Sequence, residues 1–367
     1  MKFCQIYNFA SHYRTSIYKL IDEEFDSDYL FGDNNGDIKL MDYSLLKGKV
    51  IVTHTIKLGY GSYYQKGVLR LLFKNYDSYI ILGDTRSIST WLFIIMARLF
   101  PKKRVYLWSH GWYGKETRFE RILKKIFFKL PNGGVFLYGN HARKLMIEEG
   151  FEPDKLFVIH NSLAYDKQLK IRKQITSSSI YSDYFGNTNP TLIFIGRLTK
   201  VKKLHLLIEM MQLFKEKKKL FNLVFIGDGS EKNSLIELVR NKGLINQVWF
   251  YGACYDEFKN AELIYNADLC VAPGNVGLTA MHVMVFGTPV MTHNDFSYQM
   301  PEFEAIKPGI TGDFFTRDNV ESMAECVEQW FIAKTGKRED IRQSCYKEID
   351  EYWTPEYQIQ VFKEKLK

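Results

Sequence analysis

The segment LCVAPGNVGLTAMHVMVFGTPV, residues 269–290, decides the fold class of this chain. Its first four residues form an apolar run of strand length, which Pro273 and Gly274 end before a helix-period pattern opens at Gly277. The helix pattern ends at Gly287, and the next strand starts at Val290. This order of strand, glycine turn, helix and strand is typical of a parallel α/β sheet. The turn itself leaves two interpretations open: the unpaired N–H groups of a helix start can bind a phosphate, or the turn is purely structural.

Length and composition set the outer limits. The 367 residues are enough for two ordinary domains, and an apolar content of 46% excludes a mainly disordered chain. Five cysteines without CxxC spacing predict reduced core residues rather than a disulfide framework or a zinc site. The N-terminal MKFCQIYNFA is too polar for a signal peptide, and no apolar run reaches the roughly 18 residues of a membrane span. We therefore expect a cytoplasmic protein that is soluble or peripherally bound to a membrane.

The formal net charge of +8 indicates an anionic partner, such as nucleic acid, a membrane surface or a phosphorylated substrate. No signature of a nucleic-acid-binding module accompanies the charge, so we do not expect nucleic acid. Part of the charge lies in residues 118–130, where apolar residues fall on one helical face and basic residues elsewhere. Such a helix either packs on the core or lies on an anionic membrane. The second interpretation places the protein at the inner face of the plasma membrane and favours a lipid-linked glycan as acceptor.

Strand and helix patterns alternate through two halves of the chain. Residues 1–165 form the first half, 166–190 lose the periodic pattern and are expected to be a linker, and 191–345 form the second half. Residues 346–367 are expected to be a C-terminal helix. The strand candidates of the first half are residues 2–7, 50–52, 79–82, 104–108, 135–138 and 156–159.

The motif GRLTKVKK, residues 196–203, follows a strand candidate at residues 191–195. Arg197 comes directly after Gly196, and Lys202 follows five residues later, so two cations are expected at the carboxyl edge of the sheet. Open α/β sheets bind their ligands at that edge. A guanidinium and an ammonium suit the several oxygens of a diphosphate. A solvated basic helix start is the alternative interpretation of the same residues.

Several motifs follow one another in order over residues 191–315: GRLTKVK, a strand with GDGS, VWFYG, AELIYNADLCVAP and the segment ending in GTPV. In this order they resemble the nucleotide-binding half of the large retaining glycosyltransferase family of GT-B fold, which contains bacterial enzymes of surface-polysaccharide synthesis. Residues 139–162 resemble the corresponding part of the first half, less strongly. The resemblance implies two Rossmann-like, doubly wound α/β domains facing across a cleft. It also implies a nucleotide-sugar donor and a C-terminal helix, residues 346–367, that crosses back to the first domain.

The resemblance implies roles for individual residues of the second half. Arg197 and Lys202 match the pair that grips the donor diphosphate and stabilises the leaving nucleotide. The other donor-binding residues implied are Gly196 at the strand end, Gly274, Asn275, Gly277, Leu278 and Thr279 at the helix start, and Ala253 and Cys254 near the nucleobase.

The chain departs from the family pattern at two positions. The family usually has two glutamates separated by seven residues, and alignment of the GTPV ends puts Gly274 and His282 there. The first glutamate normally lies by the donor sugar, and the second hydrogen-bonds the ribose hydroxyls. A neutral His282 can accept one such bond and donate another, although a lone helical histidine is also common as a packed residue. The glycine leaves the donor sugar open and weakens the expectation that the reaction retains configuration.

The acceptor is expected on the first half, in loops that follow strands. His110 comes just after a buried strand, so we expect it near the reacting centre, able to reach a substrate hydroxyl and titrating in the useful range. A loop histidine that caps a backbone group is the alternative interpretation. His12 and Arg14 resemble the first-strand loop that many such enzymes place beside the acceptor.

Together these features predict an enzyme that transfers a hexose or deoxyhexose from a nucleotide-diphosphate sugar to a glycan or lipid-linked glycan. Arg197, Lys202 and the helix start can neutralise the leaving diphosphate, so no metal cofactor is expected. The missing glutamates keep open a catalytically impaired nucleotide- or glycan-binding module. The shared fold keeps open a nucleotide-sugar epimerase, although no set of acidic residues suits that proton chemistry.

Overall fold

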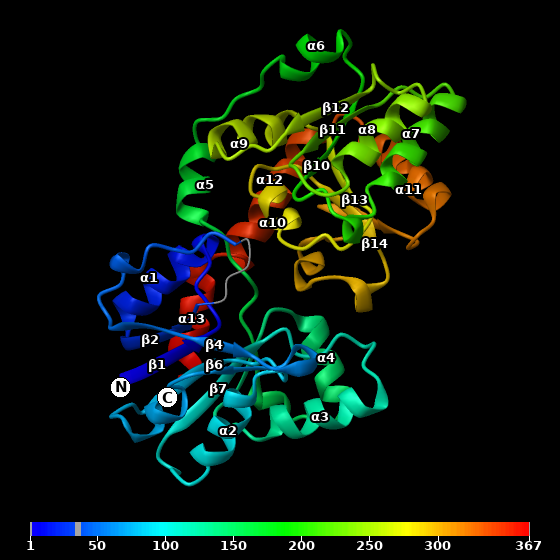
Figure 1. The fold of residues 1–367 in the computed structure, drawn as a ribbon. Helices are drawn as coiled ribbons and strands as arrows, with labels where there is room; N and C mark the ends of the chain where they lie inside the picture. Colours follow the sequence, from blue (N-terminus) through cyan, green and yellow to red (C-terminus); the bar gives the residue numbers. More distant parts are fainter. Residues whose placement is uncertain (1, 34–37, 367) are drawn as a thin grey trace. The chain divides into compact units, whose positions relative to one another are not determined.

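The computed structural model describes residues 2–33 and 38–366. It divides into two compact units, of which the first comprises Met1–Tyr165 and Trp353–Lys367 and the second Asp166–Tyr352. Each unit is built on a parallel sheet covered by helices (Figure 1). The predicted α/β class, with two Rossmann-like units, is confirmed.

In the described part of the first unit, the strands of the main sheet run in the order β3-β2-β1-β6-β7-β8-β9, all parallel. Helices α1 and α13 cover one face, where Ile17 and Phe362 join one core cluster. Helices α2, α3 and α4 cover the other, where Phe93, Phe127 and Met146 join a second cluster (Figure 1). The elements are β1 (Lys2–Tyr7), α1 (Thr15–Glu24), β2 (Asp26–Gly32), β3 (Val50–Thr53), hairpin strands β4 (Thr55–Lys57) and β5 (Tyr63–Gln65), β6 (Ser78–Leu82), α2 (Ile88–Ala97), β7 (Arg104–Ser109), α3 (Arg118–Lys129), β8 (Gly134–Leu137), α4 (Asn140–Glu148), β9 (Leu156–Val158) and α13 (Pro355–Lys365).

The second unit, in which every residue is described, has a six-stranded parallel sheet in the order β12-β11-β10-β13-β14-β15. Its central strands are short apolar runs with every residue buried, as parallel strands covered on both faces require. The elements are α5 (Tyr165–Arg172), α6 (Ile180–Phe185), β10 (Thr191–Ile195), α7 (His205–Glu216), β11 (Asn222–Ile226), α8 (Lys232–Asn241), β12 (Val248–Gly252), α9 (Glu257–Asn266), β13 (Leu269–Ala272), α10 (Thr279–Met284), β14 (Val290–His293), β15 (Gly312–Phe315), α11 (Val320–Ala333) and α12 (Arg338–Tyr352).

Strand order reverses once in each sheet, between β1 and β6 in the first and between β10 and β13 in the second. Chain segments leave such a switch point in opposite directions, and this opens space for a ligand at the carboxyl ends of the strands. The two motifs that the sequence singled out, GRLTKVKK and the glycine turn of residues 273–277, follow the two switch-point strands of the second sheet. The fold therefore brings them to one place.

The structure corrects several expected boundaries. The sequence patterns do not predict β2, the β4–β5 hairpin or β15. Residues 166–190 carry α5 and α6 and belong to the second unit, instead of forming a structureless linker. The expected C-terminal helix of residues 346–367 is two helices, because α12 runs to Tyr352 in the second unit and α13 starts at Pro355 in the first.

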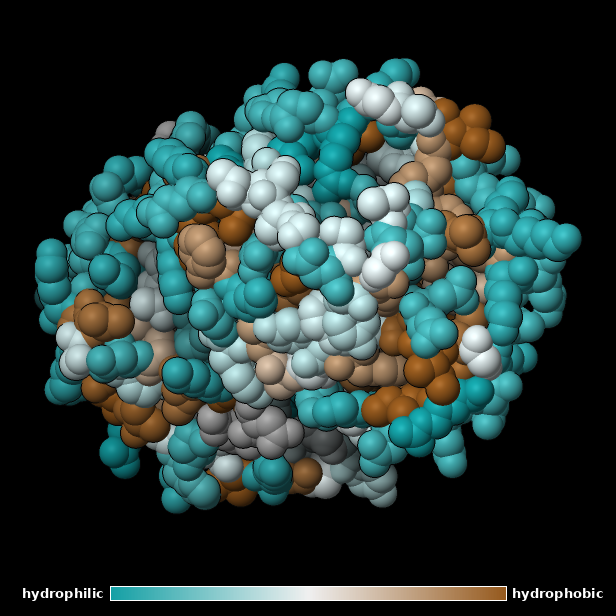
Figure 2. All heavy atoms as spheres, turned by 90° about the horizontal axis from the view of Figure 1, so that it is seen from above, coloured by the Kyte–Doolittle hydropathy of each residue, from teal (hydrophilic) through white to brown (hydrophobic). Residues whose placement is uncertain are grey.

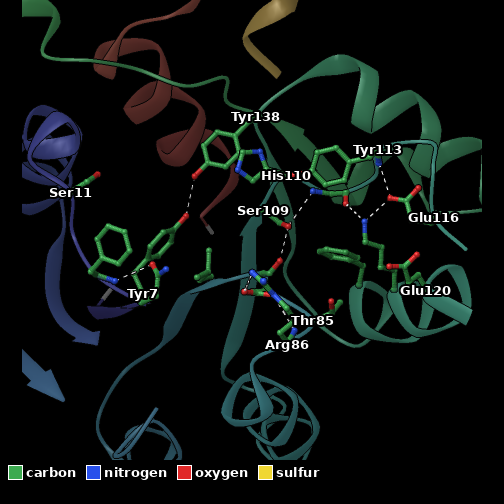
Figure 3. A pocket seen from close by; sticks show the side chains of 18 of the residues that line it. Tyr7, Ser11, Thr85, Arg86, Ser109, His110, Tyr113, Glu116, Glu120 and Tyr138 are labelled. Atoms are coloured by element: carbon green, nitrogen blue, oxygen red, sulfur yellow. Dashed lines mark hydrogen bonds and ion pairs between the residues drawn. The ribbon is translucent and has the colours of Figure 1, made fainter. Parts of the chain in front are cut away.

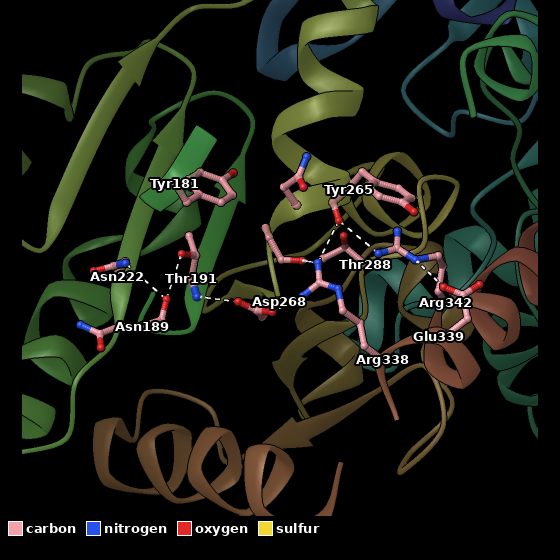
Figure 4. Close-up of polar contacts among 12 residues, drawn as sticks. Tyr181, Asn189, Thr191, Asn222, Tyr265, Asp268, Thr288, Arg338, Glu339 and Arg342 are labelled. Carbon is pink, nitrogen blue, oxygen red and sulfur yellow. Dashed lines mark hydrogen bonds and ion pairs between the residues drawn. The ribbon is translucent and has the colours of Figure 1, made fainter. Parts of the chain in front are cut away.

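The start of α12 supports the opposite, amino-terminal edge of the second sheet (Figure 4). Arg338 forms an ion pair with Asp268 and donates hydrogen bonds of 2.8 and 2.7 Å to the carbonyls of Tyr265 and Ala267. Asp268 also accepts a 2.7 Å bond from the Thr191 amide at the start of β10. Arg338 and Asp268 neutralise each other and hold the starts of neighbouring strands, so we assign them a structural role.

The face of the molecule drawn in Figure 2 is largely hydrophilic, with apolar side chains in separate groups. In the described residues, no helix is both long and apolar enough to cross a membrane.

Candidate functional site

In the second unit, the loop after β10 and the turn after β13 are joined by hydrogen bonds. The Gly274 amide donates to the Lys202 carbonyl at 3.0 Å. The Lys202 ammonium donates to the Asn275 carbonyl at 2.7 Å and to its side-chain oxygen at 2.8 Å. Lys202 is therefore held in one position against the turn that leads into α10.

Gly274 is required by this packing. A Cβ atom at position 274 would lie 2.2 Å from the Val201 carbonyl oxygen and 2.7 Å from the Lys202 Cα atom. No side chain fits there unless the loop of residues 200–203 moves. The glutamate expected at this position in the resembled family is thus incompatible with this arrangement of the loop.

The two cations differ in their surroundings. Burial lowers the pKa of Lys202 to about 8, with Glu302 opposing the shift and the Arg197 charge adding to it. Arg197 is exposed, and within the described residues its side chain makes no hydrogen bond or ion pair. The site therefore presents a positioned ammonium and a nearby guanidinium that is open to an anion.

The helix that follows the turn is short and tied to the central strand. Gly277 adopts a left-handed φ of 52°, and the position of its missing Cβ lies 3.9 Å from the Lys202 ammonium. The Thr279 hydroxyl donates a 3.0 Å bond to the Ile195 carbonyl at the end of β10. Leu278 caps the start of α10. The structure thus brings together Lys202 and the predicted donor residues 274–279. Gly196 follows directly after β10, next to the Ile195 carbonyl that Thr279 contacts.

His282, the fourth residue of α10, contacts a carboxylate that sequence reasoning missed. Its Nε2 atom lies 3.0 Å from Oε1 of Glu257, at the start of α9. The Gln168 side chain donates to the same oxygen at 2.9 Å. Burial would raise the pKa of Glu257, but the hydrogen bonds and charge of His282, with help from Gln168 and Asn260, lower it to about 2. The side chains of His282 and Glu257 each keep about a fifth of their surface exposed.

The predicted nucleobase residues lead into the same helix. Ala253 is exposed, and the Cys254 carbonyl accepts a 3.3 Å bond from the Asn260 amide of α9. Asp256 caps α9 by accepting from the amides of Phe258 and Lys259. The segment of residues 253–257 is therefore ordered by α9 and ends at the Glu257–His282 contact.

The first unit holds a cavity of about 640 Å³ at its own switch point (Figure 3). Its walls are segments that follow β1, β6, β7 and β8, together with one face of α3. Of the three residues that the sequence analysis placed on the acceptor side or near the reacting centre, Arg14 and His110 line this cavity and His12 does not. His12 is exposed, with its Nδ1 atom 3.2 Å from the Lys39 carbonyl oxygen.

Arg14 lies among aromatic residues. Its guanidinium donates to the hydroxyls of Tyr7 at 3.2 Å and Tyr138 at 2.5 Å, and these two hydroxyls lie 3.0 Å apart. The Arg14 Cζ atom is also 5.3 Å from the centre of the Trp108 ring. Figure 3 shows the Tyr7 and Tyr138 side chains reaching toward each other across the cavity wall.

His110 does not titrate in the range expected from the sequence. Its ring centre lies 4.7 Å from that of Tyr138 (Figure 3). Burial, with smaller effects from the charges of Arg14 and Lys124, lowers the pKa of His110 to about 4. The side chain is therefore neutral at physiological pH, and its buried Nδ1 atom has no hydrogen-bond partner among the described residues. His110 can donate or accept a hydrogen bond with a ligand, but at this pKa it is poorly suited to act as a general acid at physiological pH.

The carboxylates of the cavity wall are already engaged. Asp84 makes a bidentate pair with Arg86, at 3.0 and 2.9 Å. Glu116 accepts a 2.6 Å bond from Lys124, which also donates to the Gly111 carbonyl. Across residues 2–33 and 38–366, no group of three or more histidine, cysteine or acidic side chains is arranged to hold a metal ion.

Comparisons with known proteins agree with the fold. A family model described as glycosyl transferases group 1 matches residues 183–348, within the second unit. An uncharacterized 41.2 kDa protein in cps region of Klebsiella pneumoniae is 22% identical over 236 residues, which cover 63% of this chain and 57% of that protein. The chain thus matches little more than half the length of this relative.

Two solved structures match over nearly their whole length. HepE of Anabaena in complex with UDP has a TM-score of 0.72 and 16% identity, with 99% of each chain covered. The lipopolysaccharide outer core galactosyltransferase WaaB has a TM-score of 0.71 and 15% identity, covering 100% of this chain and 99% of that one. At these identities the likeness is one of fold. The chain therefore has the GT-B fold, and residues 183–348 of its second unit match the glycosyl transferases group 1 model.

Proposed function

We propose that this protein is a glycosyltransferase that moves a hexose or deoxyhexose from a nucleoside-diphosphate sugar to a glycan or lipid-linked glycan in surface-polysaccharide synthesis. The observation that carries the proposal is the pair of cations at the switch point of the second sheet. Lys202 is fixed against the turn before α10, and Arg197 has no anionic partner in the described chain. The name of the structural relative WaaB and the cps-region relative support the class of pathway.

The proposed chemistry rests on charge. When the bond between sugar and phosphate breaks, negative charge moves onto the diphosphate, and cations fixed beside it stabilise that state. Arg197 offers a planar fork of donors and Lys202 a point charge, so together they suit two phosphate groups. We propose that these groups make a divalent cation unnecessary and that the reaction retains the anomeric configuration. Product formation after treatment with EDTA, and the anomeric coupling in the product NMR spectrum, test these two statements.

The Glu257–His282 pair is proposed to hold the hydroxyls of the donor nucleoside. A carboxylate with a pKa of about 2 is ionised at all physiological pH values and is a strong hydrogen-bond acceptor. The alignment implied by the family resemblance gives His282 a position that normally carries the ribose-binding glutamate. Glu257, on helix α9, would then supply the negative charge that position 282 lacks.

On the first unit, the proposed ligand is the acceptor, with His110 donating or accepting a hydrogen bond at a substrate hydroxyl. Its low pKa argues for positioning rather than proton storage.

Helix α3 supports a proposed peripheral contact with an anionic membrane through residues 118–130. Phe127 and Phe128 of this helix pack in the core, but Phe119, Ile122 and Ile126 are 74%, 61% and 51% exposed. Arg118 and Lys129 are exposed at the two ends of this apolar stripe. Exposed apolar residues beside cations suit the interface of an anionic bilayer. A lipid-linked acceptor would be reached from such a position.

The deciding experiment is a thermal-shift and transfer assay with UDP, GDP, CDP, dTDP and their sugars. UDP comes first because the structural relative HepE was solved with it. A ligand that binds only the folded state raises the melting temperature. We expect one nucleotide to stabilise the wild type, Arg197→Ala to lose that shift, and Arg240→Ala, an exposed arginine of α8, to keep it.

The outcomes separate the alternatives. Binding together with transfer of sugar to a glycan supports the proposal. Binding without turnover, over a panel of lipid-linked and free glycans, favours the impaired binding module. Conversion of the donor without any acceptor favours an epimerase.

A further inference from the structure

The cavity of the first unit contains a cation whose charge no other described residue neutralises. Arg14 belongs to the single turn of residues 12–14 that follows β1, and its half-buried side chain lines the cavity. Its hydrogen bonds go to two phenol hydroxyls, and its Nε atom is buried without a partner. Within the described residues, no carboxylate lies within salt-bridge distance of the guanidinium.

The tyrosines cannot supply the missing negative charge. Burial raises the pKa of Tyr138 well above its usual range, so its hydroxyl stays protonated at physiological pH. Aromatic faces stabilise a guanidinium to a limited degree, and three of them lie 5.2 to 5.5 Å from Arg14 Cζ. A charge withdrawn from water in a protein is normally paired with an opposite charge. Arg14 departs from this rule at the wall of a cavity.

The other charges of the wall do not compensate it. Asp84 is committed to Arg86 and Glu116 to Lys124, as described above. Glu120 accepts from the Thr117 amide and hydroxyl, at 2.8 and 2.9 Å, in the capping box of α3. A second unused polar atom, Nδ1 of His110, lies in the same wall.

We infer that this cavity binds a negatively charged group of the acceptor, a carboxylate or a phosphate, through Arg14 and His110. Either anion would accept hydrogen bonds from the guanidinium and from His110 in its Nδ1-protonated tautomer. The volume of about 640 Å³ falls in the range of ordinary small-molecule sites, so the charged group can arrive as part of a sugar residue. The identification of this ligand as the acceptor rests on the proposed function. The anion site itself rests on the geometry of the first unit.

Calorimetric titration with three matched probes tests the inference: glucuronate, glucose 6-phosphate and neutral glucose. We expect at least one charged probe to bind about tenfold or more tightly than glucose, and the stronger of the two identifies the carboxylate or the phosphate as source. Arg14→Gln is expected to remove this preference, whereas Arg98→Gln, which changes an exposed arginine at the end of α2 outside the cavity wall, is expected to keep it. Arg197→Ala must also keep it, since this excludes binding of the probes at the donor cations.

NMR titration of the His110 ring, assigned with His110→Gln, gives an independent readout on the wild type. Because the Arg14 charge helps to lower the pKa of His110, an anion bound at Arg14 is expected to raise that pKa. If Arg14→Gln does not fold, Arg14→Lys replaces it, because lysine keeps the charge but loses the forked geometry. The NMR titration needs no variant at position 14, so it tests the inference in either case.

The inference is overturned if neither charged probe binds more tightly than glucose, if Arg14→Gln binds them like wild type, or if the His110 pKa does not move. Its failure is distinguishable from failure of the proposed function. If the protein binds a nucleotide and transfers sugar but shows no preference for anionic probes, the anion-site inference fails and the transferase proposal stands. If it shows an Arg14-dependent anion site but no transfer, the transferase proposal fails and the anion-site inference stands.

Discussion

The Nε2 atom of His282 lies 3.0 Å from Oε1 of Glu257, and this contact joins two helices that begin 22 residues apart in the sequence. Gln168 of α5 completes the contact from a third helix. Both side chains of the pair remain partly open to solvent, so the pair can reach a ligand without unfolding.

If the pair holds the donor nucleoside, Glu257→Gln is expected to weaken nucleotide binding by about 5- to 50-fold, because a neutral amide is a weaker acceptor than a carboxylate. Isothermal calorimetry with the stabilising nucleotide measures the change. The matched control is Glu262→Gln, which lies on the same helix but pairs with Lys259. Equal losses in both variants would mean that Glu257 acts only through the stability of α9.

Diphosphate binding is expected to weaken above pH 8. Since the pKa of Lys202 is lowered to about 8, the free protein loses this positive charge as pH rises through that value, and binding of an anion must then take up a proton. The nucleotide Kd should therefore be flat between pH 6.5 and 7.5 and rise by up to about tenfold per pH unit above 8. Lys202→Met should bind weakly at every pH. The nucleoside without phosphates is the control, and a similar rise for it would assign the pH dependence to another group.

Much of this site could be predicted from the sequence because its parts are local. The apolar runs of β10 and β13 and the residues that directly follow them locate Arg197, Lys202 and the glycine turn. The features that could not be predicted depend on tertiary contacts. Nothing in the spacing of residues 257 and 282 marks them as partners, and the low pKa of His110 arises from burial and the charges of Arg14 and Lys124.

Strand β2 illustrates a different limit of sequence reasoning. Its sequence DSDYLFG has aspartates at positions 26 and 28, a residue type that is depleted in strands. In the fold, Asp28 accepts a 2.6 Å bond from the Tyr76 hydroxyl and pairs with Lys2 at 3.3 Å, so the acidic end of the strand is satisfied by neighbouring elements. A strand of this kind is recognisable only once its partners are known.

Placing a glutamate at position 274, where the family resemblance implies one, is expected to damage the protein. Gly274→Ala already places a Cβ 2.2 Å from the Val201 carbonyl, and we expect it to lower the free energy of unfolding by about 1–3 kcal/mol. Gly274→Glu should also displace Lys202 and lose nucleotide binding. Urea unfolding and calorimetry measure the two effects. The control is Gly59→Ala, where a Cβ meets nothing within 4 Å. Unchanged stability of Gly274→Ala would show that the loop of residues 200–203 yields easily.

The exposed face of α3 leads to a prediction about membranes. The face consists of Phe119, Ile122 and Ile126, and α3 is anchored to α2 by the Trp91–Phe127 ring contact at 4.8 Å, so it is presented on a rigid support. Replacing the three residues by serine is expected to reduce binding to vesicles containing anionic lipid by tenfold or more, because each loses most of its apolar area. Vesicle co-sedimentation measures the binding.

The control for that experiment is a second triple serine variant, at Leu220, Ile310 and Ile332 of the other unit, which are 59%, 54% and 76% exposed. It removes comparable apolar surface from positions outside α3, so it should bind vesicles like wild type. Binding should also weaken with salt and with neutral vesicles, because Arg118 and Lys129 each contribute about 1 kcal/mol near an anionic surface. If the α3 variant binds as well as the control, the membrane contact lies elsewhere or does not exist, and the exposed stripe needs another partner.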